Sequence, residues 1–344
     1  MKALRIAMPA LLLLALAAGA LVLVMRGLQS LDEPLNVAAP MRIKIAPGSR
    51  FAHVAQDLAE RGVVAQPRSW VIFARWKGLA SRIKAGEYEI DPGATPRSLL
   101  MKLVNGQVVL HSFTIVDGWR VREMMAALRK NPDITVTVPD SAQGLTELMG
   151  KLGSPGTDPE GQFLPETYLF PAGTPDLEVL KQAHAALVRE LDSAWSGRDP
   201  SVPLRNQNEL LIMASIVQKE SALAQELPKI AGLYLHRLRI GMRLQADPTV
   251  IYGLGEAYDG DLHAVDLHTD GPYNTYMRTG LPPTPIALAG AAAINATAHP
   301  EKTDALYFVA STKDDGSHVF SATLDEQNAA VARYVAHLKQ KEAQ

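Results

Sequence analysis

The chain has 344 residues, of which 47% are hydrophobic, and a formal net charge of −2 at pH 7. This length allows about two domains with hydrophobic cores, and the charge balance, without a basic stripe, argues against nucleic acid as a partner. The sequence contains no cysteine, which excludes disulfides and thiolate-bound metals.

The first element in chain order is an uncharged run of 20 residues, Ile6 to Met25, with basic residues on both sides. As a helix it is about 30 Å long, enough to cross the hydrocarbon core of a bilayer. A cleaved signal peptide is the alternative, because Ala18-Gly19-Ala20 resembles a cleavage site. The apolar run continues past that site, which favours an uncleaved transmembrane helix. The basic residues before it predict a cytoplasmic segment 1–5, with the rest of the chain outside the cytoplasm.

A linker over residues 26–40 leads to two similar segments within residues 41–110. Each segment begins as an alternating strand, turns on Pro-Gly, and then offers a residue that can cap a helix, Ser49 or Thr95. The strands are predicted at 42–45 and 87–90, and the helices at 50–61, 67–77 and 96–104.

The start of this module resembles a LysM domain, a strand–helix–helix–strand unit that binds glycans containing N-acetylglucosamine. The resemblance covers roughly residues 41–91. The alternative is a spacer that holds the following domain away from the membrane.

From residue 111 to residue 344 the pattern mixes strands and helices. The predicted fold class is therefore α+β, with an N-terminal transmembrane helix, a small LysM-like α+β subdomain and a larger mixed α/β catalytic domain. In this last domain, strands are predicted at 113–116, 306–309 and 318–320, and helices at 121–129, 177–195, 210–227, 228–241 and 328–341.

The segment from Met213 to Ser221 carries the most informative carboxylate of the chain, Glu220. At about 100° per residue, three apolar side chains lie within roughly 60° of Glu220 on the helix: Met213, Ile216 and Val217. A carboxyl group on this inward-facing stripe is desolvated, which disfavours its ionised form. Such a group suits acid catalysis at a glycosidic bond, whereas the alternative is a glutamate that bends to solvent or pairs with an arginine.

Other hydrolytic chemistries have little support in the sequence. No Gly-x-Ser-x-Gly elbow and no His-Glu-x-x-His motif occurs. The repeated triplets Asp261-Leu262-His263 and Asp266-Leu267-His268 are predicted to be surface or capping residues. No metal or cofactor is expected.

A glycosidase usually needs a second carboxylate, and Asp247 is the candidate. However, Pro248 follows it, and this pair also fits a helix N-cap with proline at the first helical position. Without a second carboxylate, a hydroxyl of the sugar itself can serve as the nucleophile, at a large effective concentration.

Several motifs occur in order along residues 111–344, and together they resemble the YceG-like family of endolytic murein transglycosylases. This family also has an N-terminal membrane anchor and a LysM-like subdomain, so the resemblance spans nearly the whole chain. The motifs are Ala214-Ser-Ile-Val-Gln-Lys-Glu220, Leu235-His-Arg-Leu238, Gly241-Met-Arg-Leu-Gln245, Asp247-Pro-Thr-Val-Ile-Tyr-Gly253, Tyr273-Asn-Thr-Tyr276, Gly280-Leu-Pro-Pro283, His299-Pro300 and Tyr307-Phe-Val309.

The chain departs from the family pattern in two places. The family often has Glu-Lys-Glu where this chain has Gln218-Lys219-Glu220, so the catalytic role falls on Glu220. Gln218 lies about 200° round the helix from Glu220, and its lack of charge need not disturb the chemistry. The acidic-His-Asn motif near the family's C-terminus is Glu326-Gln327-Asn328 here, which removes the histidine.

The resemblance implies a lyase that cleaves the bond between N-acetylmuramic acid and N-acetylglucosamine within nascent glycan strands. The product carries a 1,6-anhydro end, and the cut terminates glycan polymerisation. Glu220 is predicted to act as acid and then as base, and the expected partners are peptidoglycan strands, the membrane and peptidoglycan synthases. The residues predicted to bind the substrate are Ser221, Gln245, Asp247, Tyr252, Tyr273, Asn274, Thr275 and Tyr276.

Two other functions stay open at this point. One is a lysozyme-type hydrolase that uses Asp247 or a water, and the other is a non-catalytic scaffold that only binds the cell wall. Product mass distinguishes the hydrolase, because hydrolysis adds one water.

Overall fold

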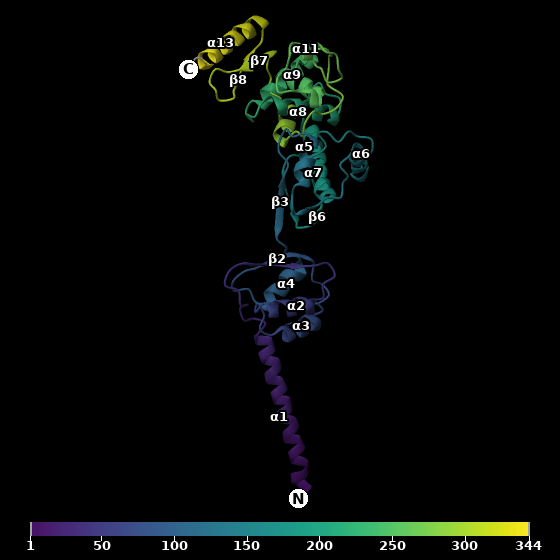
Figure 1. Cartoon of the computed structure of the whole chain (residues 1–344), viewed down its shortest axis with the longest axis vertical. Helices are drawn as coiled ribbons and strands as arrows, with labels where there is room; N and C mark the ends of the chain where they lie inside the picture. The colour runs from purple at the N-terminus through teal and green to yellow at the C-terminus, as the bar shows by residue number, and fades with distance from the viewer. Residues whose placement is uncertain (1, 343–344) are drawn as a thin grey trace. The chain divides into compact units, whose positions relative to one another are not determined.

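The computed structural model describes residues 2–342, including their side chains except those of residues 2–13, 15, 20 and 342 (Figure 1). This part of the chain mixes helices with short strands, which confirms the predicted mixed α/β composition. It forms two compact units. Unit 1 comprises Met1–His111 with Phe170–Gly173, and unit 2 comprises Ser112–Leu169 with Thr174–Gln344. The finer division into linker, LysM-like subdomain and catalytic domain stays a prediction.

Helix α1 (Lys2–Gln29) contains the predicted membrane segment. Among the residues that the structure describes, no helix is both long and apolar enough to span a membrane. Residues 6–13, 15 and 20 of the predicted segment lie outside the described side chains. The transmembrane helix is therefore not confirmed and stays a prediction.

Unit 1 has the predicted order of strand, two helices and strand. Strand β1 (Met41–Ile45) pairs antiparallel with β2 (Gly86–Ile90), and Ile43 lies opposite Tyr88. The helices are α2 (Phe51–Glu60), α3 (Pro67–Trp76) and, after β2, α4 (Pro96–Asn105). Their inward faces surround one hydrophobic core that includes Trp70, Tyr88, Leu58, Leu99 and Leu103.

Only one of the two predicted N-caps of unit 1 is correct. Thr95 caps α4, because its side chain accepts from Ser98 N and the Ser98 hydroxyl accepts from Thr95 N. Ser49 was expected to cap the helix over 50–61, but α2 starts one residue later and its N-cap is Arg50, whose side chain makes no capping hydrogen bond to a described residue. The Pro-Gly turn therefore predicts the end of the strand correctly, whereas the helix begins one residue later than predicted.

Unit 2 is mainly helical. Its helices are α5 (Val121–Arg129), α6 (Ala142–Lys151), α7 (Asp176–Gly197), α8 (Gln207–Glu220), α9 (Leu227–Arg239), α10 (Asp247–Leu254), α11 (Ala264–His268), α12 (Ala291–Ala298) and α13 (Leu324–Glu342), with the short 3₁₀ helix η1 (Gly255–Ala257). Helix α8 contacts α7, α9, α10 and α12, and it forms the centre of the unit.

The strands of this part of the chain form two-stranded sheets. Strand β3 (Leu110–Thr114) pairs with β5 (Thr167–Pro171), and β4 (Ile134–Thr135) pairs with β6 (Thr174–Pro175). Strand β7 (Tyr307–Ala310) pairs antiparallel with β8 (His318–Ser321), and α13 packs on both. Figure 1 shows β7, β8 and α13 together at the C-terminal end of the chain.

Helix α8 is buried along most of its length, which explains how it positions its last residue. The Asn206 side chain caps it by accepting from Glu209 N, and all nine residues from Glu209 to Val217 are buried. The helix ends at Glu220 because Ser221 adopts an extended backbone, with φ of −146°. Glu220 is thus carried on a rigid, core-forming element.

Candidate active site

Glu220 lies at the C-terminal end of α8, in a pocket of about 280 Å³. The pocket is lined by residues from four parts of unit 2: α8, α9, the start of α10 with the loops around it, and the β7–α13 region. The nine lining residues are Glu220, Tyr234, Arg237, Gln245, Asp247, Tyr276, Tyr307, Phe308 and Gln327. Four of them, Glu220, Gln245, Asp247 and Tyr276, are among the site residues expected from the sequence.

The Glu220 carboxylate is held by a side chain of the neighbouring helix. The hydroxyl of Tyr234, on α9, donates to Glu220 Oε1 at 2.5 Å. Tyr234 is 1% exposed, whereas Glu220 is partly exposed to the pocket. The charge-assisted hydrogen bond from this buried tyrosine fixes the carboxyl group in one orientation.

The protonated and ionised forms of Glu220 are both populated near neutral pH. Burial raises the pKa of its carboxyl group to about 7, and the negative charge of Asp247 acts in the same direction. The hydrogen bond from Tyr234 and the positive charge of Arg237 lower this pKa. A carboxyl group poised in this way can give a proton and take one back at the same pH.

Asp247 does not cap α10, contrary to one of the two interpretations of the Asp247-Pro248 pair. The N-cap is Ala246, and Asp247 is the first residue of the helix itself. Its carboxylate has a different task, because Asp247 Oδ1 accepts from the Tyr276 hydroxyl at 2.5 Å. Asp247 therefore turns its carboxylate to the pocket, and Tyr276 holds it there.

Gln245 has an unusual backbone. Its φ of 50° lies in the left-handed region, which is costly for a residue with a side chain. Two contacts support this conformation: Gln245 N donates to Thr275 O at 3.1 Å, and Ala246 N donates to Thr275 Oγ1 at 3.0 Å. The strained residue sits in the pocket wall, as strained residues often do at functional sites.

Two predicted site residues, Asn274 and Thr275, lie behind the pocket wall and support it. Both are buried. The Asn274 amide donates to the carbonyls of Asp266, Leu267 and Thr269, and its oxygen accepts from Tyr276 N at 2.9 Å. These bonds position the loop that carries Tyr276.

Ser221, Tyr252 and Tyr273 were also predicted to bind the substrate, but none of them lines this pocket. Ser221 accepts from Leu223 N, so it shapes the turn after α8. Tyr252 and Tyr273 form an edge-to-face pair with centroids 4.8 Å apart, next to the buried carboxylate of Glu160. These three residues lie in segments that also contribute pocket residues, but their own side chains make the contacts just described and do not line the pocket.

Arg237 is a pocket residue that the sequence did not identify. It is buried, donating from Nε to Leu306 O at 2.6 Å and from Nη1 to Leu244 O at 2.5 Å. It thereby joins α9 to the residue before Gln245 and to the residue before Tyr307. The guanidinium also lies 5.3 Å from the centre of the Tyr307 ring.

The C-terminal side of the pocket was likewise missed. The Gln327 amide donates to Phe308 O at 3.0 Å, while its buried Oε1 has no hydrogen-bond partner among the described residues. The Phe308 ring packs edge-on against Tyr234, with centroids 6.1 Å apart. The position where the family pattern has histidine thus carries an amide that contacts the site.

The histidine triplets behave as predicted. Asp266 accepts from His263 N at 2.9 Å in a capping box at the start of α11, and His263 contacts Asp259 at 3.2 Å. In the part of the chain that the structure describes, no group of three or more His, Asp or Glu residues is placed to hold a metal ion.

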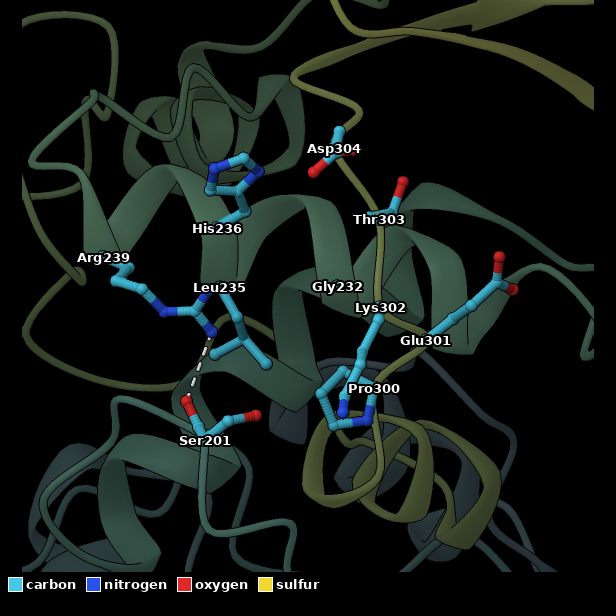
Figure 2. Close-up of a pocket in the computed structure, with 10 residues that line it drawn as sticks. All are labelled: Ser201, Gly232, Leu235, His236, Arg239, Pro300, Glu301, Lys302, Thr303 and Asp304. Atoms are coloured by element: carbon cyan, nitrogen blue, oxygen red, sulfur yellow. Dashed lines mark hydrogen bonds between the residues drawn. The ribbon is translucent and has the colours of Figure 1, made fainter.

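A second pocket, of about 380 Å³, lies on the other face of α9 (Figure 2). Gly232, Leu235, His236 and Arg239 face it, whereas Tyr234 and Arg237 of the same helix line the Glu220 pocket. Figure 2 shows the segment of residues 300–304 passing close over Gly232. A Cβ atom at Gly232 would lie 2.1 Å from Glu301 O, so only glycine permits this approach.

Gly232→Ala is expected to destabilise unit 2 by about 3 kcal/mol, because the added methyl group meets a backbone oxygen that cannot rotate away. The measurement is urea unfolding followed by circular dichroism. Gly150→Ala is the matched control, since Gly150 also lies in a helix, α6, but a Cβ atom there would meet no other atom within 4 Å. The control variant should be as stable as the parent or slightly more stable; equal midpoints for both variants would contradict the packing interpretation.

Comparison with known proteins gives a consistent picture. The model of the YceG-like family matches residues 43–333. An endolytic murein transglycosylase of Bacillus subtilis (strain 168) is 31% identical over 333 residues, which cover 91% of this chain and 90% of that protein. An endolytic murein transglycosylase of Streptococcus pneumoniae (serotype 2, strain D39) is 25% identical over 325 residues, which cover 85% of this chain but 58% of that longer protein.

One solved structure is also similar. The crystal structure of a putative YceG-like protein from Listeria monocytogenes aligns with a TM-score of 0.49 and 25% sequence identity. The alignment covers 84% of this chain and 98% of that one.

Proposed function

This chain belongs to the YceG-like family, and we propose that it is an endolytic murein transglycosylase with Glu220 as its catalytic acid and base. The activity is supported by relatives of that name, one of them similar over nine-tenths of both chains. The single observation that carries the role of Glu220 is its place in the pocket, hydrogen-bonded to Tyr234 with a pKa raised to about 7.

The proposed reaction uses one carboxyl group twice. Protonated Glu220 gives its proton to the glycosidic oxygen between N-acetylmuramic acid and N-acetylglucosamine, and the C1–O bond breaks. Positive charge then develops at C1 and the ring oxygen. Ionised Glu220 removes the proton from the C6 hydroxyl of the same muramic acid, whose oxygen bonds to C1. Glu220 is protonated again, the product carries a 1,6-anhydro end, and no water is consumed.

The chain's other pocket residues fit supporting roles in this reaction. Tyr234 stabilises the ionised form of Glu220, which the reaction requires between the two proton transfers. The Asp247 carboxylate faces the pocket and suits the developing positive charge at C1. The Tyr307 and Phe308 rings offer apolar faces for a sugar, and Gln327 lines the same side of the pocket.

Mass spectrometry of the products from intact glycan strands tests the proposal. A lytic transglycosylase releases fragments with anhydromuramic ends that are about 18 Da lighter per cut than hydrolysis products, as follows from the water that is not added. Fragments with reducing ends alone would favour the hydrolase, and saturable binding without turnover would favour the scaffold.

Asp247→Asn separates the two enzyme proposals. We expect about a tenfold loss of rate, equivalent to roughly 1.4 kcal/mol of lost electrostatic stabilisation, with anhydro products unchanged. Removing the charge also lowers the pKa of Glu220, so the decline of activity with rising pH should begin at lower pH. The measurement is kcat/KM against pH. A loss as complete as that caused by removing Glu220 would instead assign Asp247 an essential role, as in a lysozyme-type hydrolase.

We also propose that residues 6–25 of α1 anchor the chain in the bacterial inner membrane, with residues 1–5 in the cytoplasm and both units on the periplasmic side. The uncharged run in the sequence supports this, as do the exposed apolar side chains of Leu21 to Met25. Anchoring would keep the enzyme close to nascent glycan strands and to the synthases that polymerise them.

A further inference from the structure

Helix α3 of unit 1 exposes two large apolar side chains that the core does not use. Ile72 is 69% exposed and Trp76 is 72% exposed, while Trp70, Phe73 and Ala74 on the same helix are buried. Ile72 and Trp76 are at positions i and i+4, so both lie on one face of the helix. Contiguous exposed apolar surface that is rimmed by polar residues marks protein–protein or membrane interaction sites.

Helix α3 and the segment that follows it are strongly basic. Residues 67–86 contain five basic residues and no acidic one. Arg68 and Arg75 are exposed and lie on the helix face of Ile72 and Trp76, within roughly 60° of Ile72. Lys77 Nζ lies 4.4 Å from the centre of the Trp76 ring. The surface is therefore apolar at its centre and positively charged around it.

This helix is joined directly to the end of α1. α1 and α3 contact each other, and a Cβ atom at Gly27 of α1 would lie 2.9 Å from the Ser69 hydroxyl of α3. Just after α1, Leu31 is buried in the core of unit 1, which fixes the end of α1 to the unit. The exposed apolar side chains of α1 and the exposed face of α3 thus belong to one compact unit.

We infer that the α3 face formed by Arg68, Ile72, Arg75 and Trp76 is a membrane-interface surface that rests on a bilayer containing anionic lipid. Tryptophan is the side chain most suited to the boundary between headgroups and acyl chains, because its ring is apolar and its indole N–H is polar. The positive charges of Arg68 and Arg75 are attracted to the negative surface potential of a leaflet that contains anionic lipid. An amphipathic helix with this pattern lies in the plane of the interface.

The inference extends the proposed membrane anchoring by α1, and it assigns unit 1 a second contact with the same bilayer. A single helix leaves the attached unit free to tilt and rotate. A basic, tryptophan-bearing helix next to the anchor restricts that motion, because α3 must stay in the interface. Unit 1 would then hold a defined orientation on the membrane, independent of any glycan.

The absence of cysteine from the sequence makes a site-specific test straightforward. Ile72→Cys in the full-length chain is labelled with an environment-sensitive fluorophore and reconstituted into vesicles of phosphatidylcholine with or without phosphatidylglycerol. Met101→Cys on α4 is the matched control, because Met101 is also an exposed apolar helix residue of unit 1, at 42%. Leu21→Cys on α1 reports separately whether the anchor is in lipid.

The expected result is a blue shift of the label at position 72, loss of its emission with nitroxide-bearing lipid, and neither effect at position 101. The shift should grow with phosphatidylglycerol and shrink with salt or after Arg68→Glu with Arg75→Glu. A label at 72 that stays in water overturns the inference, whether or not position 21 is in lipid. A shift that depends on protein concentration and resists the lipid quencher also overturns it, because a second copy or another protein then covers the face. Transglycosylase activity is measured in a separate assay, so failure of the membrane contact can be distinguished from failure of the proposed enzymatic function.

Discussion

Glu220→Gln is expected to abolish the release of anhydro-ended glycans, with a loss of about 10³-fold or more. Glutamine has nearly the shape of glutamate but neither gives nor takes a proton at neutral pH, so it removes both proton transfers of the proposed mechanism. General acid–base catalysis by one group is typically worth about 10² to 10⁴-fold, and here the same group serves both steps. The measurement is the rate of anhydromuropeptide release from purified peptidoglycan, by liquid chromatography and mass spectrometry.

The control for this variant is Glu178→Gln, which changes an exposed glutamate of α7 that pairs with Lys181 on the protein surface. It should keep the parent rate. Both variants should show the parent's circular dichroism spectrum and bind glycan strands, because the substitution at Glu220 leaves the pocket walls in place. Release of anhydro products at the parent rate by the Glu220 variant would mean that another group supplies the proton.

The sequence was sufficient to recognise the family, which the comparisons confirm, and to place Glu220 near the end of a buried helix, as the structure shows. The catalytic role of Glu220 stays a prediction. Both inferences rest on local information. The apolar stripe of α8 and its end near Ser221 are set by neighbours within a few residues, as are Pro248 at the start of α10 and the limits of α5. The motifs that indicate the family are also short runs of adjacent residues, so they can be recognised without knowledge of the tertiary structure.

The missed pocket residues depend on long-range contacts. Tyr234 reaches Glu220 from a different helix, 14 residues later, and nothing in the spacing shows which face of α9 turns inward. Gln327 enters through the packing of α13 on β7, about a hundred residues further on. Residues of this kind are fixed by tertiary packing, which a single sequence does not display.

The predicted substrate-binding residues that do not line the pocket show a second limit. Asn274 and Thr275 have side chains suited to sugar hydroxyls, and so do backbone-supporting residues, because both tasks use the same donors and acceptors. The structure separates the tasks by direction: Asn274 points to three backbone carbonyls, whereas Tyr276 points to Asp247. Asp247 shows the reverse case, since its proline neighbour favoured a capping role, whereas the structure makes Ala246 the N-cap.

Tyr234→Phe is expected to lower kcat about 10- to 100-fold and to move the decline of activity to higher pH. The reaction needs protonated Glu220 at its start, so kcat/KM is constant at low pH and falls as pH rises through the pKa of Glu220, about 7 in the parent. The Tyr234 hydrogen bond lowers this pKa, because the hydroxyl donates to the ionised carboxylate. Phenylalanine removes the donor, so the pKa rises and the protonated form persists to higher pH.

The rate therefore falls while the pH of half-maximal kcat/KM rises. This combination distinguishes the positioning role of Tyr234 from simple structural damage. The rate falls because Glu220 must ionise during the reaction, and a hydrogen bond to a charged group is worth about 1.5 to 3 kcal/mol. Tyr307→Phe is the matched control, because Tyr307 lines the same pocket without a hydrogen bond to Glu220 in the described structure. It should leave the pH of half-maximal kcat/KM in place. If Tyr234→Phe lowers the rate equally at every pH, the hydroxyl does not tune Glu220, and its contribution is confined to packing.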